Sequence, residues 1–63
     1  MKMNIRFLSK DDRQLAEDLL KTEGWDCRGT SAYLTVEIDG LEQTGLVQER
    51  LNAAEIGWRD MDY

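Results

Sequence analysis

Few side chains in this sequence could carry out catalysis, because it has one cysteine and no histidine. Without histidine, a general base near neutral pH would have to be a carboxylate or a lysine with a strongly shifted pKa, and a chain of 63 residues offers little depth in which to shift one. Cys27 has no histidine to activate it as a nucleophile, and beside Trp25 on a strand it is typical of a small core residue. We therefore expect a protein that is not an enzyme.

Metal and cofactor sites are as scarce as catalytic groups. A single thiol cannot form an internal disulfide, and without histidine the usual zinc ligand sets are absent. The triplet Asp60, Met61, Asp62 lacks the glycine and the spaced ligands of an EF-hand loop, and no phosphate-binding glycine loop occurs. The sequence predicts no metal and no cofactor, and it leaves packing as the source of stability.

Charge is the remaining property that could serve recognition. The chain has 13 acids and 8 bases, a net charge of −5. Residues 1–31 contain six of each and sum to zero, whereas residues 32–63 contain seven acids and two bases and carry the whole excess. Such a field attracts basic protein surfaces and repels phosphates, although an acidic surface can also serve solubility alone. We expect the second half to form one acidic side of the molecule.

The first half of the chain has the pattern of a strand followed by a helix. Met3, Ile5 and Phe7 alternate with polar residues, which predicts a strand with one face on a core. Ser9 is placed to cap a helix of about residues 10–23, and Gly24 is placed to end it in the left-handed conformation. The side chains expected on the buried stripe of this helix are Leu15, Ala16, Leu19 and Leu20.

A hairpin is expected next. Residues 25–28 are typical of a short strand, and Gly29, Thr30 and Ser31 of a tight connection. Residues 32–38 give the clearest alternation in the chain. The side chains expected to face inward are Ala32, Leu34, Val36 and Ile38, and those expected to face outward are Tyr33, Thr35 and Glu37.

A second helix and a last strand complete the predicted elements. Asp39 and Glu42 fit a capping box for a helix of roughly residues 41–55, although Gly45 could delay its start to near Thr44. Gly57 is expected to end the helix, before a strand over residues 58–63. The side chains expected to be buried on this helix are Leu46, Val47, Leu51 and Ala54.

Strict alternation in the last strand would bury Asp60 and Asp62 if Trp58 pointed inward, and burying unpaired carboxylates is very costly. Either Trp58 precedes the strand or a bulge resets the alternation. We favour Met61 inward with both aspartates outward.

The element order predicts one compact domain, residues 1–63, of class α+β. Two strand-helix-strand halves joined by a hairpin give β-α-β-β-α-β, the ferredoxin-like arrangement, with two helices on one face of a four-stranded antiparallel sheet. The same topology can bind RNA by stacking bases on its central strands. Here only Tyr33 could stack, and the acids would repel phosphates, so we expect no direct binding of nucleic acid.

The overall build, from the strand MNIRFLS and the helix DDRQLAEDLLKTEG through the strand AYLTVEIDG and the helix EQTGLVQERLNAAE to the tail GWRDMDY, resembles small phage-encoded anti-CRISPR proteins. Some inhibitors of type I interference complexes have this fold with an anionic surface. The resemblance is one of build and matches no specific motif. It implies an acidic DNA mimic that occupies the DNA channel of a Cas subunit in the cytoplasm of a bacterial host. No run of apolar residues suggests a secretory signal or a membrane span, so we expect no membrane partner.

Contacts with a basic partner are expected mainly from the second half of the chain, where arginine forks would suit carboxylates. A different interpretation is a regulatory or structural module that dimerises through the edge strand at residues 58–63, although we expect a monomer. The candidate contact residues are the carboxylates Glu37, Asp39, Glu42, Glu49, Asp60 and Asp62, with Tyr33, Trp58 and Tyr63 as aromatic anchors.

Overall fold

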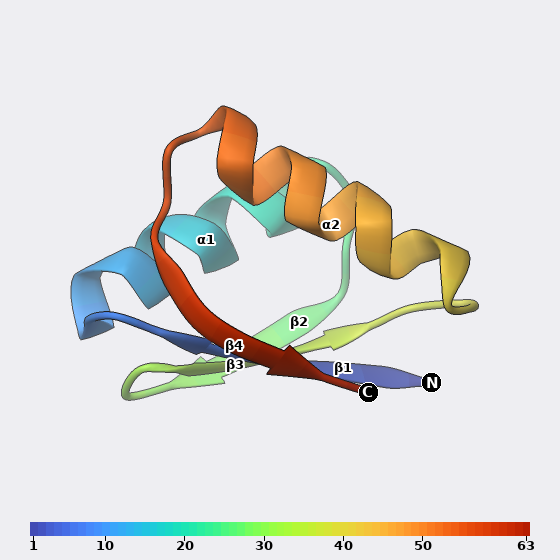
Figure 1. Ribbon diagram of the computed structural model, residues 1–63, viewed down its shortest axis with the longest axis horizontal. Helices are drawn as coiled ribbons and strands as arrows, with labels where there is room; N and C mark the ends of the chain where they lie inside the picture. The colour runs from blue at the N-terminus through green and yellow to red at the C-terminus, as the bar shows by residue number, and fades with distance from the viewer.

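A computed structural model describes residues 1–63 and confirms the predicted order of elements, β-α-β-β-α-β. The sheet has the order β2-β3-β1-β4 with every neighbouring pair antiparallel, and both helices lie on one of its faces (Figure 1). This is the ferredoxin-like arrangement. The elements are β1 (Lys2–Phe7), α1 (Lys10–Thr22), β2 (Cys27–Thr30), β3 (Tyr33–Glu37), α2 (Glu42–Ala53) and β4 (Trp58–Asp62).

The strand order changes what the uneven charge of the sequence means. β1 and β2 come from the neutral half and β3 and β4 from the acidic half, and the two kinds alternate across the sheet. The halves of the sequence are therefore not halves of the molecule. The expectation of one acidic side formed by the second half is wrong, because β1 separates β3 from β4.

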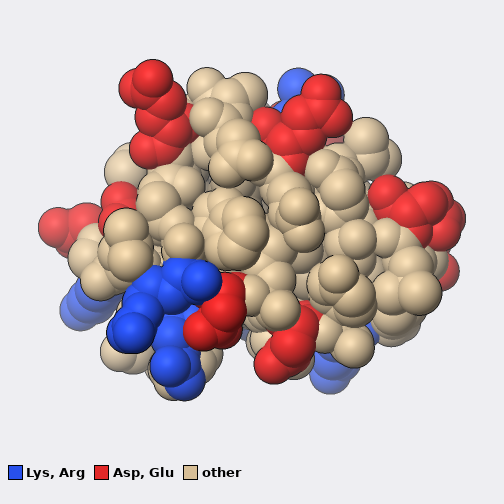
Figure 2. Space-filling view, in the orientation of Figure 1, with Lys and Arg blue, Asp and Glu red and all other residues tan.

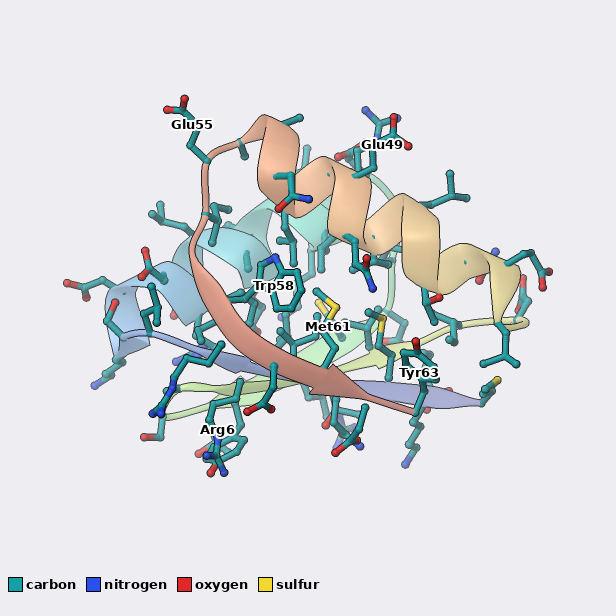
Figure 3. The ribbon with its side chains drawn as sticks, viewed as in Figure 1. Arg6, Glu49, Glu55, Trp58, Met61 and Tyr63 are labelled. Carbon is teal, nitrogen blue, oxygen red and sulfur yellow. The ribbon has the colours of Figure 1, made fainter.

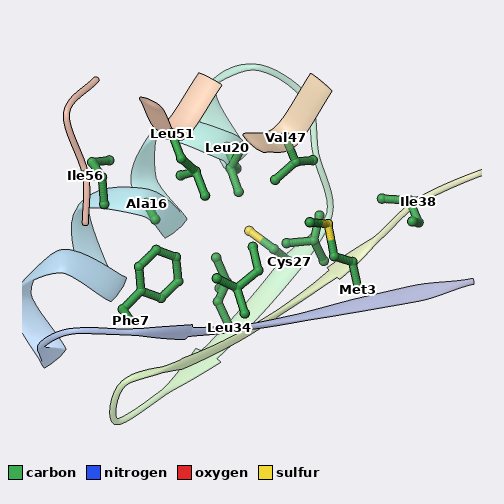
Figure 4. Close-up of a cluster of buried hydrophobic side chains, with 12 residues drawn as sticks. Met3, Phe7, Ala16, Leu20, Cys27, Leu34, Ile38, Val47, Leu51 and Ile56 are labelled. Atoms are coloured by element: carbon green, nitrogen blue, oxygen red, sulfur yellow. The ribbon is translucent and has the colours of Figure 1, made fainter. Parts of the chain in front are cut away.

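A single core fills the space between the sheet and the helices (Figure 4). The alternation predicted in the two central strands is confirmed for Met3, Ile5, Phe7, Leu34, Val36 and Ile38, which are buried. Ala32, also expected inward, is instead half-buried in the turn before β3. Ile56, which follows α2, joins this core and was missed because it lies outside any periodic segment. The core residues are Met3, Ile5, Phe7, Ala16, Leu20, Cys27, Leu34, Val36, Ile38, Val47, Leu51 and Ile56.

The buried face of α1 is rotated from the predicted stripe. Ala16 and Leu20 are buried as expected, and Leu19 is half-buried against the core. Leu15 is 57% exposed, and Arg13 is buried in its place. Positions 13, 16 and 20 share one face at helical spacing, whereas Leu15 points away from it. The sequence pattern favoured leucine over arginine and so placed the face wrongly.

Helix α2 is less regular than predicted. It buries Val47 and Leu51 as expected, but Leu46 is 52% exposed and Ala54 is exposed, while Thr44 is buried. The stripe at positions 44, 47 and 51 contains a threonine, which hydrophobic periodicity overlooks.

The ends of α2 also differ from the predictions. The helix begins at Glu42 with Leu41 as an N-cap that makes no side-chain hydrogen bond, so the predicted capping box is absent. Instead, the Asp39 N–H donates to Gln43 Oε1 at 2.6 Å. The helix ends at Ala53, and the left-handed residue after it is Glu55, with φ 58°, in place of Gly57.

The β2–β3 hairpin is shifted by about two residues from its predicted position. Gly29 and Thr30 belong to β2, and Ser31 and Ala32 form the turn. Gly29 is required by packing, since a Cβ there would lie 2.5 Å from Arg13 Cδ. The glycine lets β2 approach α1 closely and does not mark the turn.

Of the two alternatives for the last strand, the structure shows the bulge, and the preferred orientation with Met61 inward and both aspartates outward is confirmed. Phe7 pairs with Trp58 and Arg6 with Asp60, so Arg59 is the extra residue. Trp58 and Met61 pack against the core, and Asp60 and Asp62 are exposed. The bulge resolves the conflict between an inward tryptophan and outward carboxylates.

Candidate functional site

The six predicted contact carboxylates are all exposed, but they lie in four different places along the fold. Glu37 ends β3, where its Oε1 is 4.0 Å from Lys2 Nζ. Asp39 and Glu42 lie between β3 and α2, Glu49 projects from α2 away from the sheet (Figure 3), and Asp60 and Asp62 lie on β4. In Figure 2 the acids occupy separate patches around an area without charge. No single broad anionic face comparable to a DNA surface results.

Two of the three aromatic candidates, Tyr33 and Trp58, already have intramolecular partners. Tyr33 is 48% exposed, and Arg6 Nη2 donates to its hydroxyl at 2.6 Å, with the guanidinium carbon 5.0 Å from the ring centroid. Trp58 lies on the helix side of the sheet against the core, and its Nε1–H donates to Asn52 Oδ1 at 3.4 Å (Figure 3). Only the exposed part of Trp58 is open to a partner. Tyr63 is 59% exposed.

The open face of the sheet carries nearly balanced charge. A polar chain crosses it, in which Thr35 Oγ1 donates to Asn4 Oδ1 at 2.8 Å and Asn4 Nδ2 donates to Asp62 Oδ1 at 3.3 Å. The charged side chains of the four strands are four bases and three acids, which nearly cancel: Lys2, Arg6, Arg28, Arg59, Glu37, Asp60 and Asp62.

Carboxylates converge in one hollow, where the end of α1 and the start of β2 meet the end of β3 and α2. It contains four carboxylates and one guanidinium, so its formal charge is −3. Arg50 Nε lies 3.0 Å from Glu23 Oε1, and Glu37 Oε1 is 4.0 Å from Lys2 Nζ, which is not part of the lining. Asp26 and Asp39 form no salt bridge. We call this the acidic hollow, and its lining is Glu23, Gly24, Trp25, Asp26, Glu37, Asp39, Gln43, Leu46 and Arg50.

The acidic hollow suits a cationic side chain. Carboxylates accept charge-assisted hydrogen bonds from a guanidinium or ammonium group, and the ring of Trp25 offers a cation–π surface. Leu46 is exposed at the rim and can cover the aliphatic stem of a lysine or arginine. No group of three or more Asp, Glu, Cys or His side chains in the molecule is arranged to hold a metal ion. The arrangement therefore fits a basic side chain of a protein.

Two members of the acidic hollow, Glu23 and Asp26, were missed because they belong to the neutral half of the sequence. The observed hairpin register, which differs from the predicted one, places Asp26 beside Glu37. Cys27 of β2 pairs with Val36 of β3, so Asp26, which precedes Cys27, must lie beside Glu37, which follows Val36. The Glu37 N–H donates to Asp26 O at 2.8 Å. Glu23 could not be placed by any strand register, because its place depends on how α1 packs against α2.

A second charged cluster, on α1, runs from buried Arg13 through half-buried Glu17 to exposed Lys21 and serves stability. Arg13 is buried, pairs with Glu17, and donates through Nε to Ser31 O at 2.9 Å. Lys21 Nζ lies 2.7 Å from the other oxygen of Glu17. Hydrogen bonding from Lys21 lowers the pKa of Glu17; partial burial opposes this, and Arg13 adds to it. The cluster links the helix to the β2–β3 turn and leaves none of its charges free.

Cys27 is buried in the core beneath α1. Burial raises the pKa of its thiol, and the nearby Glu17 carboxylate adds to the rise. A raised pKa keeps the thiol protonated at neutral pH, which suits the core role predicted for this residue.

Comparison of the chain with models of protein families, with curated proteins and with solved structures found no match. None of the helices has the length and apolar character needed to cross a membrane.

Proposed function

We propose that this protein is a non-enzymatic inhibitor that binds a basic, nucleic-acid-handling surface, and that the surface belongs to a Cas subunit of a type I CRISPR complex. The observation that carries the proposal is the acidic hollow, where the carboxylates of residues 23–26 and 37–39 converge beside Trp25. A basic partner is the chemistry this hollow fits. The choice of a Cas subunit in a bacterial host follows from the resemblance in build to anti-CRISPR proteins.

The free charges of the molecule support a basic partner. Three of the 13 acids, Glu17, Glu23 and Glu37, form salt bridges, which leaves ten without an ion partner. Four of the 8 bases form salt bridges, which leaves four. This excess of free carboxylates favours encounter with a basic surface and opposes encounter with DNA or RNA.

In the proposed mechanism, the inhibitor and DNA compete for the same arginine and lysine side chains of the partner. An arginine or lysine that would bind a DNA phosphate enters the acidic hollow instead, where Asp26 and Glu37 can accept its N–H groups. Because the other acids are scattered over the surface, we expect one specific contact at the acidic hollow and only general electrostatic attraction around it. The scattered acids do not reproduce the regular spacing of a phosphate backbone, so the inhibitor need not follow the path of the DNA.

The test is inhibition of target-DNA binding by a purified type I interference complex, followed by electrophoretic mobility shift. The triple variant Asp26→Asn, Glu37→Gln, Asp39→Asn removes three charges from the acidic hollow. We expect its half-inhibitory concentration to rise about tenfold or more, and inhibition by the unaltered protein to weaken as salt rises.

The matched control removes three charges elsewhere, through Asp11→Asn, Asp18→Asn and Glu55→Gln. These side chains are exposed and lie outside the acidic hollow. We expect less than about a twofold change for this control. Equal losses in both triple variants would overturn the role of the hollow, and absence of inhibition by the unaltered protein would overturn the proposed partner.

A further inference from the structure

The outer edge of β4 has hydrogen-bonding groups that no strand of this chain uses. β4 is last in the order β2-β3-β1-β4, so it pairs only with β1. The Phe7 N–H donates to Ala32 O at 2.8 Å, and Met1 O accepts from the Ile38 N–H at 2.9 Å. The odd-numbered residues of β1 thus direct their backbone groups toward β3, and Asn4 and Arg6 direct theirs toward β4.

This alternation identifies which residue of β4 faces outward. Asn4 is opposite Asp62 and Arg6 is opposite Asp60, so the backbone groups of both aspartates point toward β1. Met61, between them, must direct its N–H and C=O away from the sheet. An added antiparallel strand would exchange both hydrogen bonds with Met61. Its residues opposite Asp60 and Asp62 would then be in the non-hydrogen-bonded pairs, where side chains approach most closely.

The charges on this edge select the added strand. Asp60 and Asp62 are exposed on the open face, and neither forms a salt bridge within the chain. Arg6, the neighbour of Asp60, hydrogen-bonds to Tyr33 instead. Basic residues at alternate positions of an added strand would meet both carboxylates, and opposite charges in such pairs are favourable.

A second copy of this chain is a poor occupant of the same edge. Two antiparallel copies of β4 would be related by a two-fold axis perpendicular to the sheet. Residues that face each other across the pair have side chains on the same side of the sheet, so the axis must lie midway between one residue and its own copy. An axis through Met61 places Asp60 against Asp62 twice, and an axis through either aspartate places it against itself. Like charges directly opposite are destabilising. The edge therefore resists self-pairing and favours a basic strand.

We propose that the β4 edge binds an extended basic segment of a partner protein, with lysine or arginine opposite Asp60 and Asp62 and an apolar residue opposite Met61. This inference rests on the proposed function in that the partner is basic, but it concerns a surface separate from the acidic hollow. Met61 packs against the core from the helix side (Figure 3), so the apolar residue would extend that contact. The bulge at Arg59 limits the regular edge to the three residues that follow it.

The test uses the full chain labelled with ¹⁵N and a synthetic peptide, acetyl-Thr-Lys-Val-Lys-Thr-amide, in an NMR titration at low salt. We expect the Met61 amide to show one of the largest shifts and to gain protection from hydrogen exchange. A peptide of the same composition, acetyl-Lys-Lys-Val-Thr-Thr-amide, places its lysines on opposite faces and should bind several-fold more weakly.

Two variants separate charge from backbone pairing. Asp60→Asn with Asp62→Asn should weaken peptide binding about tenfold, whereas the control Asp11→Asn with Asp18→Asn should change it less than about twofold. Met61→Pro removes the outward N–H and should abolish binding, while Met61→Ala keeps it.

An unshifted Met61 amide, or equal losses in the two charge variants, would overturn the edge site. So would concentration-dependent dimers that dissociate on Met61→Pro. Because the peptide is supplied directly, these outcomes do not depend on the identity of the partner. Failure of the proposed function would instead appear as loss of inhibition with an intact peptide response.

Discussion

The two helices lie on the same face of the sheet but handle their charges in opposite ways (Figure 1). In α1, Ser9 accepts the Asp12 N–H at 3.1 Å, and Arg13, Glu17 and Lys21 form a closed ionic cluster. In α2, the N-cap makes no side-chain hydrogen bond, and the one salt bridge joins exposed Arg50 to Glu23.

The difference indicates a division of roles. The ionic cluster of α1 is satisfied within the fold, so it fixes the helix on the sheet and offers little to a partner, although Lys10, Asp11, Asp12 and Asp18 of this helix have no ion partner. Helix α2 exposes Leu46 and the unpaired Glu49, its N-cap Leu41 is also exposed, and it lends Leu46 and Arg50 to the acidic hollow. We infer that α1 stabilises the domain and that α2 contributes to the surface that a partner meets.

The largest expected effect comes from two arginines that each pair with a glutamate. Arg13→Ala should lower the free energy of unfolding by about 3 kcal/mol, because it leaves a partly buried carboxylate short of its partner and removes the bond to Ser31 O. Arg50→Ala, the matched change on α2, should cost less than about 1 kcal/mol, because its pair is solvent-exposed. Urea unfolding followed by tryptophan fluorescence measures both. Equal costs would break the comparison between the helices.

A smaller effect is expected from acid. The folded pKa of Glu17 is lowered from 4.5, so its ionised form stabilises the fold above about pH 4.5, and this stabilisation is lost as pH falls through the folded pKa. Glu17→Gln should be less stable than the unaltered protein near neutral pH, and the difference should shrink as pH falls below that value. Thermal unfolding across this range measures it.

The control for the acid prediction is Glu49→Gln on α2, whose carboxylate has no ion partner. This change should leave stability nearly the same as in the unaltered protein. A pH-independent difference for Glu17→Gln would show that the ionic cluster does not stabilise the fold through the charge of Glu17.

The sequence predicted the element order, both central strands and the outward aspartates of the last strand, because each follows from local alternation or from the cost of burying Asp60 and Asp62. It left the bulge as one of two alternatives. It misplaced the face of α1, since hydrophobic periodicity cannot anticipate that Arg13 is buried when Glu17 and Ser31 O satisfy it. It misplaced the β2–β3 turn because Gly29 lies within β2, where the absence of a Cβ lets the strand pack closely against Arg13 of α1. Local sequence patterns thus gave wrong predictions where a contact with a distant part of the chain determines the position of a residue.

The candidate site was predicted only in part for the same reason. Glu37 and Asp39 were chosen for belonging to an acidic half, but they meet Glu23 and Asp26 because the hairpin and the two helices converge. Summing charge along the chain cannot reveal this, since the sheet alternates strands from both halves. The register of the predicted hairpin, with its turn at residues 29–31, would have placed Asp26 opposite Leu34, so it would not have recovered Asp26 either.

The smallest expected effect concerns how the two helices end. After α1 the left-handed residue is Gly24, with φ 97°, and after α2 it is Glu55, with φ 58°. A side chain in this conformation costs about 1–2 kcal/mol, and glycine adds about 0.4–1 kcal/mol of freedom to the unfolded chain. Glu55→Gly should therefore raise the free energy of unfolding by about 0.5 kcal/mol, measured by urea unfolding.

Gly24→Ala is the reciprocal change at the end of α1. A Cβ there would contact nothing within 4 Å, so the cost is conformational alone, about 1 kcal/mol of lost stability. Opposite signs for the two substitutions would indicate that α1 already has its preferred terminal residue and that α2 retains removable strain. A loss of stability in Glu55→Gly would mean that the glutamate side chain contributes contacts that outweigh its backbone strain, and α2 would then be as fully satisfied at this end as α1.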